Sequence, residues 1–400
     1  MNVLVTDGEN RSALAVTRSL GKRGCGVFVA GKDSGNISAS SKYCRRAFTT
    51  PDPLSDGAGY AQAVAEIAGR EGIDVIFPMT EQSVYSLNRA REQLGARVVL
   101  ACAPPEMMEA VSNKYKLFQL AERLGVVVPE TLYVADASNF FVQRARILRY
   151  PVVVKPAFSK IEDGDRIIAT RVMFAATPGE LDRLYETKPE LRFPSLIQEL
   201  IIGEGTGLFT LFDRNRHLAL FSHRRLLEKP PTGGVSVLSE SVPLDGEMVE
   251  SAGKLLSEVG WQGIAMVEFK RDTRDGRAKL MEINGRFWGS LQLAIFSGVD
   301  FPALCLDYYL GRNPSQSSVY RVGQRLKWFY GIVDHLLIRL KRGDGSLNLP
   351  PDSPSCWQVV GKLLGVGGRS TTSDVYDLRD LRPFMAETKA YISGFFRARQ

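Results

Sequence analysis

Residues 266–289 carry the pattern that most restricts the fold: two β-prone apolar runs that flank a tight polar turn. The stretch reads MVEFKRDTRDGRAKLMEINGRFWG, with the turn at residues 272–276. A turn of this kind between such runs predicts an antiparallel hairpin. Because alternate residues of a strand point to the same face, Glu282 and Asn284 share one face, and Glu268 can lie opposite them on the neighbouring strand.

The predicted hairpin gathers oxygen donors beside a cation. Two carboxylates and an amide oxygen suit Mg²⁺, which is commonly held by one or two carboxylates together with substrate phosphates. Arg286, two residues after Asn284, can then face a phosphate or a carboxylate. The alternative is that Glu268 and Glu282 belong to a solvated strand face with ordinary cross-strand pairs.

The composition is that of a globular chain: 400 residues, 44% hydrophobic and 24% charged, long enough for two or three domains. The net charge is +7, but no Lys/Arg-rich run is interleaved with aromatic residues, so the pattern does not support nucleic acid binding. Five scattered cysteines without a CxxC pair indicate a reducing compartment. Without a signal-peptide pattern or an apolar run of about 18 residues, we expect a cytoplasmic protein.

The first part of the chain, residues 1–104, alternates strands and helices. Strands are predicted at residues 2–6, 26–30, 75–78 and 98–101, and helices at residues 14–22 and 60–71. This alternation predicts a doubly wound α/β domain with a parallel sheet. Binding loops in such sheets follow the carboxyl ends of strands, which makes Glu81, with Thr80 and Ser83, a candidate for substrate contact. The first loop is not GxGxxG, so the dinucleotide-binding fingerprint is absent.

Residues 105–311 show a different pattern. Two prolines, Pro104 and Pro105, interrupt the chain, and a helix then ends at Gly125. From Pro151 onward short strands dominate, separated by turns that contain Gly, Asp and Asn. We expect an α+β region of antiparallel sheets here.

Residues 312–400 are predicted to form a helical C-terminal extension. An amphipathic helix with basic ends is expected at residues 326–342, and a loop or linker at residues 343–355. The apolar face of such a helix most often packs on a core, and a membrane surface is the less favoured alternative.

Two lysines, Lys155 and Lys114, lie where a positive charge needs a compensating anion. Lys155 closes the buried apolar run PVVVKP, and a phosphate oxygen is a natural partner for its ammonium group. An edge lysine that reaches solvent is the alternative. Lys114 lies just before an amphipathic helix, where the helix dipole disfavours a cation, so it is a weaker candidate.

The segment SLIQELIIG, residues 195–203, ends a strand at Gln198 and Glu199 and continues into apolar residues. A flat adenine needs apolar surfaces on its faces and backbone hydrogen bonds at its edge, and a strand-to-loop hinge supplies both. Glu204 follows closely and can accept from ribose hydroxyls. The alternative is a plain surface strand end.

A candidate substrate loop, HRRLLEKPPTGGVSVLSES at residues 223–241, precedes the hairpin. Its arginines suit a carboxylate or an acylphosphate, its paired glycines permit a tight turn near a ligand, and its last glutamate can bind an amine or take its proton. A mobile surface loop with ordinary charges is the alternative. The candidate contacts are Arg224, Arg225, Gly233, Gly234 and Glu240. His217 and His335 lie apart from these motifs and are expected to be structural.

In chain order, Lys114 and the segments VVVKP, IQELIIGE and VEFKR…MEINGR closely resemble the ATP-grasp family over about residues 1–310. The resemblance implies an N-terminal α/β domain followed by a two-lobed ATP-grasp domain. It implies that Lys114 and Lys155 hold the phosphates of ATP. The adenine and ribose contacts implied by it are Gln198, Glu199, Ile201 and Glu204.

The same resemblance assigns Mg²⁺ to Glu268, Glu282 and Asn284, with Mn²⁺ as an alternative ion, and places Arg286 beside the transferred phosphate and the acyl substrate. One stretch departs from the family. The loop after Lys155 is usually rich in glycine, but here it reads AFSKIEDGDR and contains only Gly164. Such a loop can still donate to phosphates, although less backbone can approach them closely.

The implied function is an ADP-forming ligase that activates a carboxylate as an acylphosphate and joins it to an amine, with Arg286 and Lys155 as catalytic groups. Its partners would be a small-molecule carboxylate and amine, without nucleic acid, and a homodimer is left open. Two alternatives are a carboxylase-type enzyme that uses bicarbonate and a catalytically inactive nucleotide-binding regulatory protein.

Overall fold

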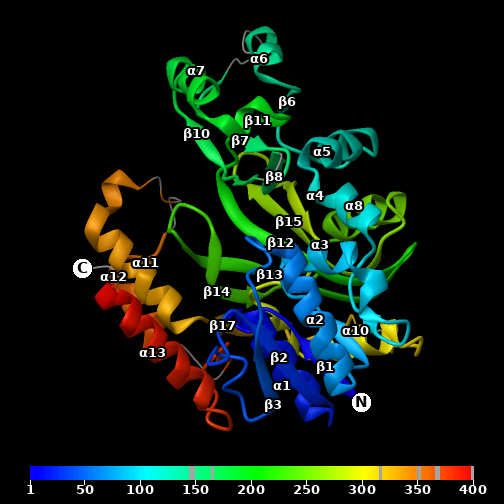
Figure 1. The fold of residues 1–400 in the computed structure, drawn as a ribbon. Coiled ribbons are helices and arrows are strands. Elements are labelled where there is room, and N and C mark those ends of the chain that lie inside the picture. Colours follow the sequence, from blue (N-terminus) through cyan, green and yellow to red (C-terminus); the bar gives the residue numbers. More distant parts are fainter. Residues whose placement is uncertain are drawn as a thin grey trace.

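A computed structural model describes residues 1–143, 149–163, 166–314, 318–347, 349, 353–364 and 370–397. Figure 1 shows three regions: an N-terminal α/β unit, a small lobe of strands and helices at the top of the view, and a large central sheet between them. The predicted combination of α/β and α+β architecture is confirmed.

The N-terminal unit is built on a five-stranded sheet in which every neighbouring pair is parallel. Its order is β3-β2-β1-β4-β5, which is that of a doubly wound sheet, as predicted. Its strands are β1 (Asn2–Val5), β2 (Gly26–Gly31), β3 (Cys44–Thr49), β4 (Val75–Phe77) and β5 (Val99–Leu100). The sequence reading missed β3, because its CRRAFT segment has neither a long apolar run nor an alternating pattern.

The helices of this unit are α1 (Arg11–Lys22), α2 (Gly57–Glu71) and α3 (Glu81–Arg89), followed by α4 (Pro105–Ser112) and α5 (Lys114–Arg123). Side chains at their starts set several of these boundaries: Asp56 caps α2, Thr80 caps α3 and Asn113 caps α5, each accepting a hydrogen bond from a backbone N–H of the first turn. The caps place Glu81 and Lys114 at the first positions of α3 and α5.

The small lobe is an antiparallel sheet in the order β10-β7-β11-β6. Its elements are β6 (Thr131–Val134), α6 (Ala137–Gln143), β7 (Val152–Pro156), β10 (Met173–Ala175), α7 (Pro178–Thr187) and β11 (Ser195–Glu199). A separate hairpin, β8 (Lys160–Asp163) and β9 (Arg166–Ala169), follows β7 at the place of the predicted loop over the phosphates. Gly164, the glycine of that loop, lies outside the described residues.

The large sheet has seven strands in the order β16-β15-β12-β13-β14-β17-β18. The strands are β12 (Gly203–Asp213), β13 (Arg216–Lys229), β14 (Val235–Ser241), β15 (Gln262–Asp272), β16 (Ala278–Asn284), β17 (Arg325–Lys327) and β18 (Thr371–Ser373). The helices α8 (Gly246–Glu258), α9 (Leu291–Ser297) and α10 (Phe301–Tyr309) belong to the same part of the chain. The predicted hairpin is β15–β16, and its pairing is antiparallel.

The C-terminal extension differs in part from the prediction. It contains α11 (Phe329–Arg342), α12 (Cys356–Leu363) and α13 (Arg382–Arg397), but also the strands β17 and β18, which complete the large sheet. The helix expected from residue 326 therefore begins at Phe329, because Arg325–Lys327 pairs with β14 and β18. As expected, α11 buries one face, which includes Ile332 and His335. Within the described residues, every helix is too short or too polar to span a bilayer.

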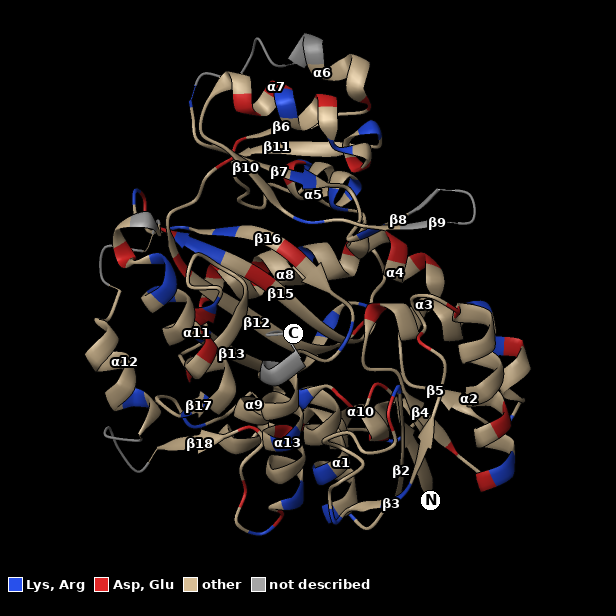
Figure 2. Cartoon of the chain, turned by 60° about the vertical axis from the view of Figure 1, so that its left-hand side comes forward, with Lys and Arg blue, Asp and Glu red and all other residues tan. Residues whose placement is uncertain are grey.

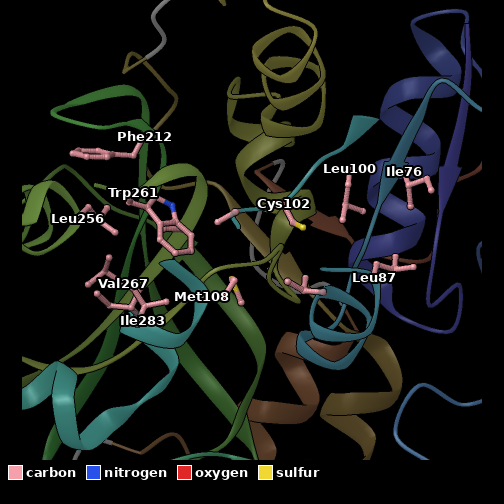
Figure 3. Close-up of a cluster of buried hydrophobic side chains, with 14 of the residues drawn as sticks. Ile76, Leu87, Leu100, Cys102, Met108, Phe212, Leu256, Trp261, Val267 and Ile283 are labelled. Carbon is pink, nitrogen blue, oxygen red and sulfur yellow. The ribbon is translucent and has the colours of Figure 1, made fainter. Parts of the chain in front are cut away.

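One hydrophobic cluster joins the N-terminal unit to the large sheet, as the labelled side chains in Figure 3 show. Leu87 and Leu100 come from the N-terminal unit, Val267 and Ile283 come from β15 and β16, and Met108 of α4 belongs to the same cluster. This shared core holds the N-terminal loops and the β15–β16 hairpin in a defined relation, since close-packed interiors deform little.

Candidate active site

The predicted acids of the hairpin face each other. Glu268 of β15 lies directly opposite Glu282 of β16, and Met266 lies opposite Asn284. Glu268, Glu282 and Asn284 therefore share one face of the large sheet, as the alternation of the sequence predicts. Figure 2 shows acidic bands on both strands where they run side by side below the small lobe.

Neighbouring cations neutralise both carboxylates. An Arg225 nitrogen lies 2.5 Å from Glu268 Oε2, and Lys114 Nζ lies 3.8 Å from Glu282 Oε2. Burial, together with the charge of Glu282, outweighs the Arg225 guanidinium and raises the pKa of Glu268. Burial acts in the same direction on Glu282, but Lys114 and a hydrogen bond from Asn284 outweigh it and hold the pKa of Glu282 below its ordinary value.

The side chains beyond Glu282 form a short polar chain. Asn284 Nδ2 donates to Glu282 Oε1 at 2.9 Å, and an Arg286 nitrogen donates to Asn284 Oδ1 at 3.2 Å. Gly285 lies between them because a Cβ there would be 2.4 Å from the ring of Trp261 and 2.6 Å from the sulfur of Met108. Packing of the hydrophobic core against Gly285 thus fixes the backbone positions of Asn284 and Arg286.

Lys155 approaches the same place from the small lobe. It lies on β7, is 9% exposed, and its Nζ is 3.9 Å from Met281 Sδ and 5.6 Å from the centre of the Phe118 ring. Burial lowers the pKa of Lys155 to about 8; the charge of Glu282 opposes this change, and Lys114 adds to it. An anion bound beside this buried ammonium group would therefore stabilise its charged form.

Lys114 is held at the mouth of the cleft. Its backbone N–H donates to the carbonyl of Ala157 at 2.7 Å, and its Nζ donates to Ser159 Oγ at 3.3 Å. The start of α5 is thereby tied to the loop that follows β7. Ser159 lies in the stretch that was expected to donate to the phosphates.

A small cavity connects these groups to the N-terminal unit. Its lining includes Glu81 of α3 together with Lys114, Ser159, Glu282, Asn284 and Arg286. The predicted substrate residue Glu81 is therefore brought beside Arg286, although the two residues are 205 positions apart in the chain.

The donor set fits a hard divalent cation. In the described part of the chain, no three His, Cys, Asp or Glu side chains lie together so as to hold a metal ion by themselves. The set is instead two carboxylates and the amide of Asn284, which suits Mg²⁺ when phosphate oxygens and water supply the remaining ligands. Glu268 and Glu282 would then exchange their present cationic partners for the ion.

The segment predicted to contact adenine is the end of strand β11. The side chains of Gln198 and Glu199 at this end already bond to other residues of the chain. Glu199 binds Lys279 at 2.9 Å and Arg274 at 2.6 Å, and these ion pairs hold the small lobe to the β15–β16 turn. Gln198 is buried and donates to Thr131 at 2.9 Å. Contact of Glu199 with a nucleotide would therefore involve its backbone.

Lys270, which the sequence did not single out, lies beside the segment predicted to contact adenine. Its Nζ donates to the carbonyl of Ile201 at 3.0 Å, and burial lowers its pKa. The signal was present, because Lys270 lies two residues after Glu268 and so shares its face of the strand.

Three predicted residues do not join this site. Arg224 and Arg225 are adjacent on β13 and therefore point to opposite faces of the sheet. Arg225 reaches Glu268, whereas Arg224 binds Glu240 at 2.6 Å and Glu204 at 3.4 Å. The predicted ribose contact Glu204 and the predicted amine contact Glu240 thus belong to an ion cluster on the face opposite the metal-type acids.

The glycines of the predicted substrate loop lie at the β13–β14 turn, close to Arg225. The carbonyl of Gly234 accepts from Arg225 at 3.1 Å, and a Cβ at Gly234 would lie 2.5 Å from the carbonyl oxygen of Lys229. Gly233 precedes it with φ of 126°, a conformation that favours glycine. Glu228, which the sequence reading missed, holds the same arginine at 3.0 Å.

His217 and His335, which were expected to be structural, both lie within hydrogen-bonding distance of groups of the fold. His217 Nδ1 lies 2.9 Å from Thr210 Oγ1, and His335 Nδ1 lies 2.7 Å from the carbonyl oxygen of Glu228. His223, a neighbour of the predicted arginines, is buried against Phe209, and its Nε2 lies 2.7 Å from Ser290 Oγ. Burial lowers the pKa of His223 to about 3, so it is neutral at physiological pH.

Comparison with known proteins agrees with this fold. A family model described as "ATP-grasp in the biosynthetic pathway with Ter operon" matches residues 222–331. The structure of a biotin carboxylase–β-γ-ATP complex from Campylobacter jejuni superposes with a TM-score of 0.64 at 18% identity, covering 81% of this chain and 74% of that one. This chain has the ATP-grasp fold. An L-amino acid ligase from Bacillus licheniformis shares it, with a TM-score of 0.57 at 19% identity and coverage of 77% and 74%.

A known ligase is also similar to this chain in sequence. The D-aspartate ligase of Enterococcus faecium (strain Aus0004) is 23% identical over an alignment of 276 residues, and the match covers 64% of this chain and 64% of that protein. The match therefore spans less than two-thirds of the relative. The predicted ATP-grasp resemblance is confirmed for the fold.

Proposed function

We propose that this ATP-grasp protein is an ADP-forming ligase that activates a carboxylate with ATP and joins it to an amine. The observation that carries the proposal is the convergence of five groups on one cleft. Glu268 and Glu282 face each other below Lys114 and Lys155, and Arg286 closes the row beside Asn284. Acids that can hold a cation and bases that can hold phosphates thus lie together where the small lobe meets the large sheet.

In this proposal the two lysines serve as the phosphate contacts. Lys155 is buried and Lys114 is mostly buried, so their interaction with an anion is screened less than it would be at an open surface. Phosphoryl transfer depends mainly on positioning and on electrostatic stabilisation of the transferred group, which is what fixed cations supply.

Glu268, Glu282 and Asn284 are the residues that would hold Mg²⁺. When bound, the ion neutralises phosphate charge and orients the oxygens of the transferred group. Arg286 donates to two neutral acceptors, the carbonyl oxygen of Phe287 and Oδ1 of Asn284. Its charge can therefore pair with the carboxylate substrate or with the acylphosphate made from it.

The acceptor amine would approach from the N-terminal unit. Glu81 lies in the cavity that contains Arg286 and is the carboxylate there that is not already assigned to the metal-type set. A carboxylate at this place can hold an ammonium group or accept its proton. The known activities of the similar proteins, D-aspartate ligation and L-amino acid ligation, support an amino acid as one substrate.

A second candidate is a bicarbonate-using enzyme. The specific observation in its favour is the likeness to biotin carboxylase structures, one of which is described as bound to bicarbonate. Bicarbonate-dependent ADP release without any other carboxylate would favour this candidate. A catalytically inactive nucleotide-binding protein would instead bind ATP and release no ADP with any acceptor.

The test is ADP release in a screen of carboxylates paired with amino acids and polyamines. Glu282→Gln keeps the size of the side chain but removes the charge that faces Lys114, and it should abolish ADP release while the variant stays folded. Glu204→Gln is a matched control on the same sheet, because Glu204 lies on the opposite face. Full turnover in Glu282→Gln would refute the proposed metal set, and loss of turnover in Glu204→Gln would restore Glu204 as a nucleotide contact.

A further inference from the structure

The net charge of the chain is concentrated in its C-terminal extension. Residues 312–400 contain 14 Lys and Arg against 7 Asp and Glu, whereas residues 1–311 contain 37 of each, so the extension accounts for the whole +7. Two of its acids, Asp374 and Asp380, are buried against Arg11 and Arg18 of α1. Arg339 of the extension is also buried, and Arg325 is paired with Glu240, but the part of the extension that meets solvent keeps an excess of Lys and Arg.

Exposed apolar side chains are concentrated in the same region. Among the large apolar side chains exposed in the described part of the chain, 11 of 16 lie between residues 319 and 392. Trp357 is 86% exposed, Leu378 75% and Leu364 74%. They are Val319, Val322, Leu337, Leu340, Trp357, Leu364, Tyr376, Leu378, Leu381, Met385 and Ile392.

Four of these residues belong to α12 and α13, two to each helix. On α12, Trp357 lies seven residues before the exposed Leu364 at the end of the helix. On α13, Met385 lies seven residues before Ile392, with the exposed Lys389 between them. A spacing of seven residues returns to the same helix face.

The inner sides of these helices are already occupied. Phe384 and Tyr391 of α13 stack on Tyr330 of α11, and Val359 of α12 lies in a cluster with Ile332. Figure 1 shows α11, α12 and α13 together on one side of the molecule. The exposed stripes are thus what this helical layer presents to its surroundings.

We propose that the C-terminal helical layer, α11 to α13, docks on an anionic membrane surface. Apolar side chains with a tryptophan can enter the headgroup region, and the surrounding Lys and Arg are attracted to anionic lipids. A second copy of this chain is a poorer partner, because the same basic face would meet itself and repel.

A hollow beside α13 adds a place for a lipid phosphate. A cavity of about 340 Å³ lies between residues 39–44 and α13, lined by Lys42, Arg382 and Met385 among others. Two cations and an apolar side chain around one hollow match a headgroup phosphate with the start of its acyl region. The hollow opens next to the stripe that contains Met385, so one contact can use both.

The experiment is sedimentation of the full chain with vesicles of phosphatidylcholine alone and with about one-third phosphatidylserine. We expect binding to the anionic vesicles, loss of binding in high salt, and little binding to neutral vesicles. The double variant Arg382→Gln/Lys389→Gln should bind about 25-fold less, from about fivefold for each cation. The matched control Lys22→Gln/Lys188→Gln, on α1 and at the end of α7, should bind as the unaltered chain does.

Tryptophan fluorescence gives a second readout. Trp261 and Trp288 are buried, and Trp328 is partly buried with its Nε1 hydrogen-bonded to Glu387, so the exposed Trp357 should give the main blue shift on adding anionic vesicles. Trp357→Phe should lose this shift while retaining most of the binding. Trp357→Ser/Leu364→Ser should weaken binding, whereas Phe174→Ser, an equally drastic change at an exposed site on the small lobe, should not.

Three results would overturn the proposal. One is the absence of binding to any vesicle, and another is equal binding to neutral and anionic vesicles. The third is self-association of the chain, detected by light scattering and abolished by Trp357→Ser/Leu364→Ser, without vesicle binding; it would assign the face to a second copy.

Discussion

In the candidate active site, the two carboxylates of the hairpin each lie beside a cation of the chain. Arg225 neutralises Glu268, and Lys114 lies near Glu282. Lys155 has no carboxylate within ion-pair distance among the pairs that the structure describes, and its neighbours are Met281 and Phe118. Lys155 is therefore the residue whose protonation should change most when a nucleotide enters.

This leads to a prediction on proton uptake. Because burial lowers the pKa of Lys155 to about 8, the free chain holds this lysine mainly neutral at about pH 9, and a triphosphate should raise the pKa again. ATP binding should therefore take up close to one proton at about pH 9 and almost none near pH 6.5. Calorimetry in two buffers of different ionisation enthalpy measures this uptake.

Lys155→Met is the control for that measurement. It should weaken ATP binding by about tenfold or more, the loss of one charge-assisted contact, and it should remove the proton uptake. Uptake of the same size in Lys155→Met would assign the titration to another group and contradict the predicted role.

Among the elements, α13 carries a carboxyl group that is half-satisfied in a largely buried place. Its Glu387 accepts a hydrogen bond from Trp328 Nε1 at 2.8 Å, while the other carboxylate oxygen is buried without a partner. Burial raises the pKa of Glu387 to about 7, with the charge of Asp374 adding to the effect. Below about pH 7, the Glu387 carboxyl group is therefore mainly protonated in the folded chain.

The contribution of Glu387 to stability should depend on pH. Because its pKa is higher in the folded chain than in the unfolded one, its stabilising effect is complete below about pH 4.5 and is lost as the pH rises through about 7. Glu387→Gln removes the charge and keeps an acceptor for Trp328. It should raise the free energy of unfolding by about 1–2 kcal/mol at pH 8, a discounted value for a partly exposed group, and by little at pH 5.

Urea unfolding at both pH values measures this difference, and hydrogen exchange of Arg382–Arg397 shows whether it is local to α13. An equal effect of Glu387→Gln at pH 5 and pH 8 would show that the carboxyl group is not titrating in the folded state.

At the scale of the whole molecule, the two ends of the chain are joined by a buried arginine. Arg18 of α1 is 3% exposed and binds Asp380 at 2.9 Å. It also donates to the carbonyl oxygens of Asp374, Val375 and Asp380. The C-terminal extension thereby connects the N-terminal unit to the large sheet, which it extends with β17 and β18.

Removal of this arginine should be costly. Arg18→Met leaves three buried carbonyl groups without this donor and removes the cation beside Asp380, which keeps its hydrogen bonds from Ser41 and the backbone of Lys42. We expect a loss of about 3–5 kcal/mol in the free energy of unfolding. Arg23→Met on the same helix breaks the more exposed pair with Asp307 and should cost about 1 kcal/mol or less. Thermal or urea unfolding compares the two variants, and similar losses would contradict a special role for Arg18.

Much of the fold followed from local patterns. Turn chemistry and strand alternation placed Glu268, Glu282 and Asn284 on one face, and the apolar run before Lys155 indicated a buried strand end. Helix boundaries near Asp56 and Thr80 follow from side-chain caps. These features depend on neighbours within a few residues, so the sequence contains their signal.

Other features depended on contacts between distant segments. Arg325–Lys327 became a strand because β14 and β18 offered pairing on both sides, although its pattern continued a helix. Glu204 and Arg224 turned away from the cleft, while Lys270 and Arg225 turned toward it. A shift of one residue in strand register reverses every side chain. The residue types at the cleft were therefore determined by the sequence alone, whereas the choice of which residues enter it was made by the pairing of strands far apart in the chain.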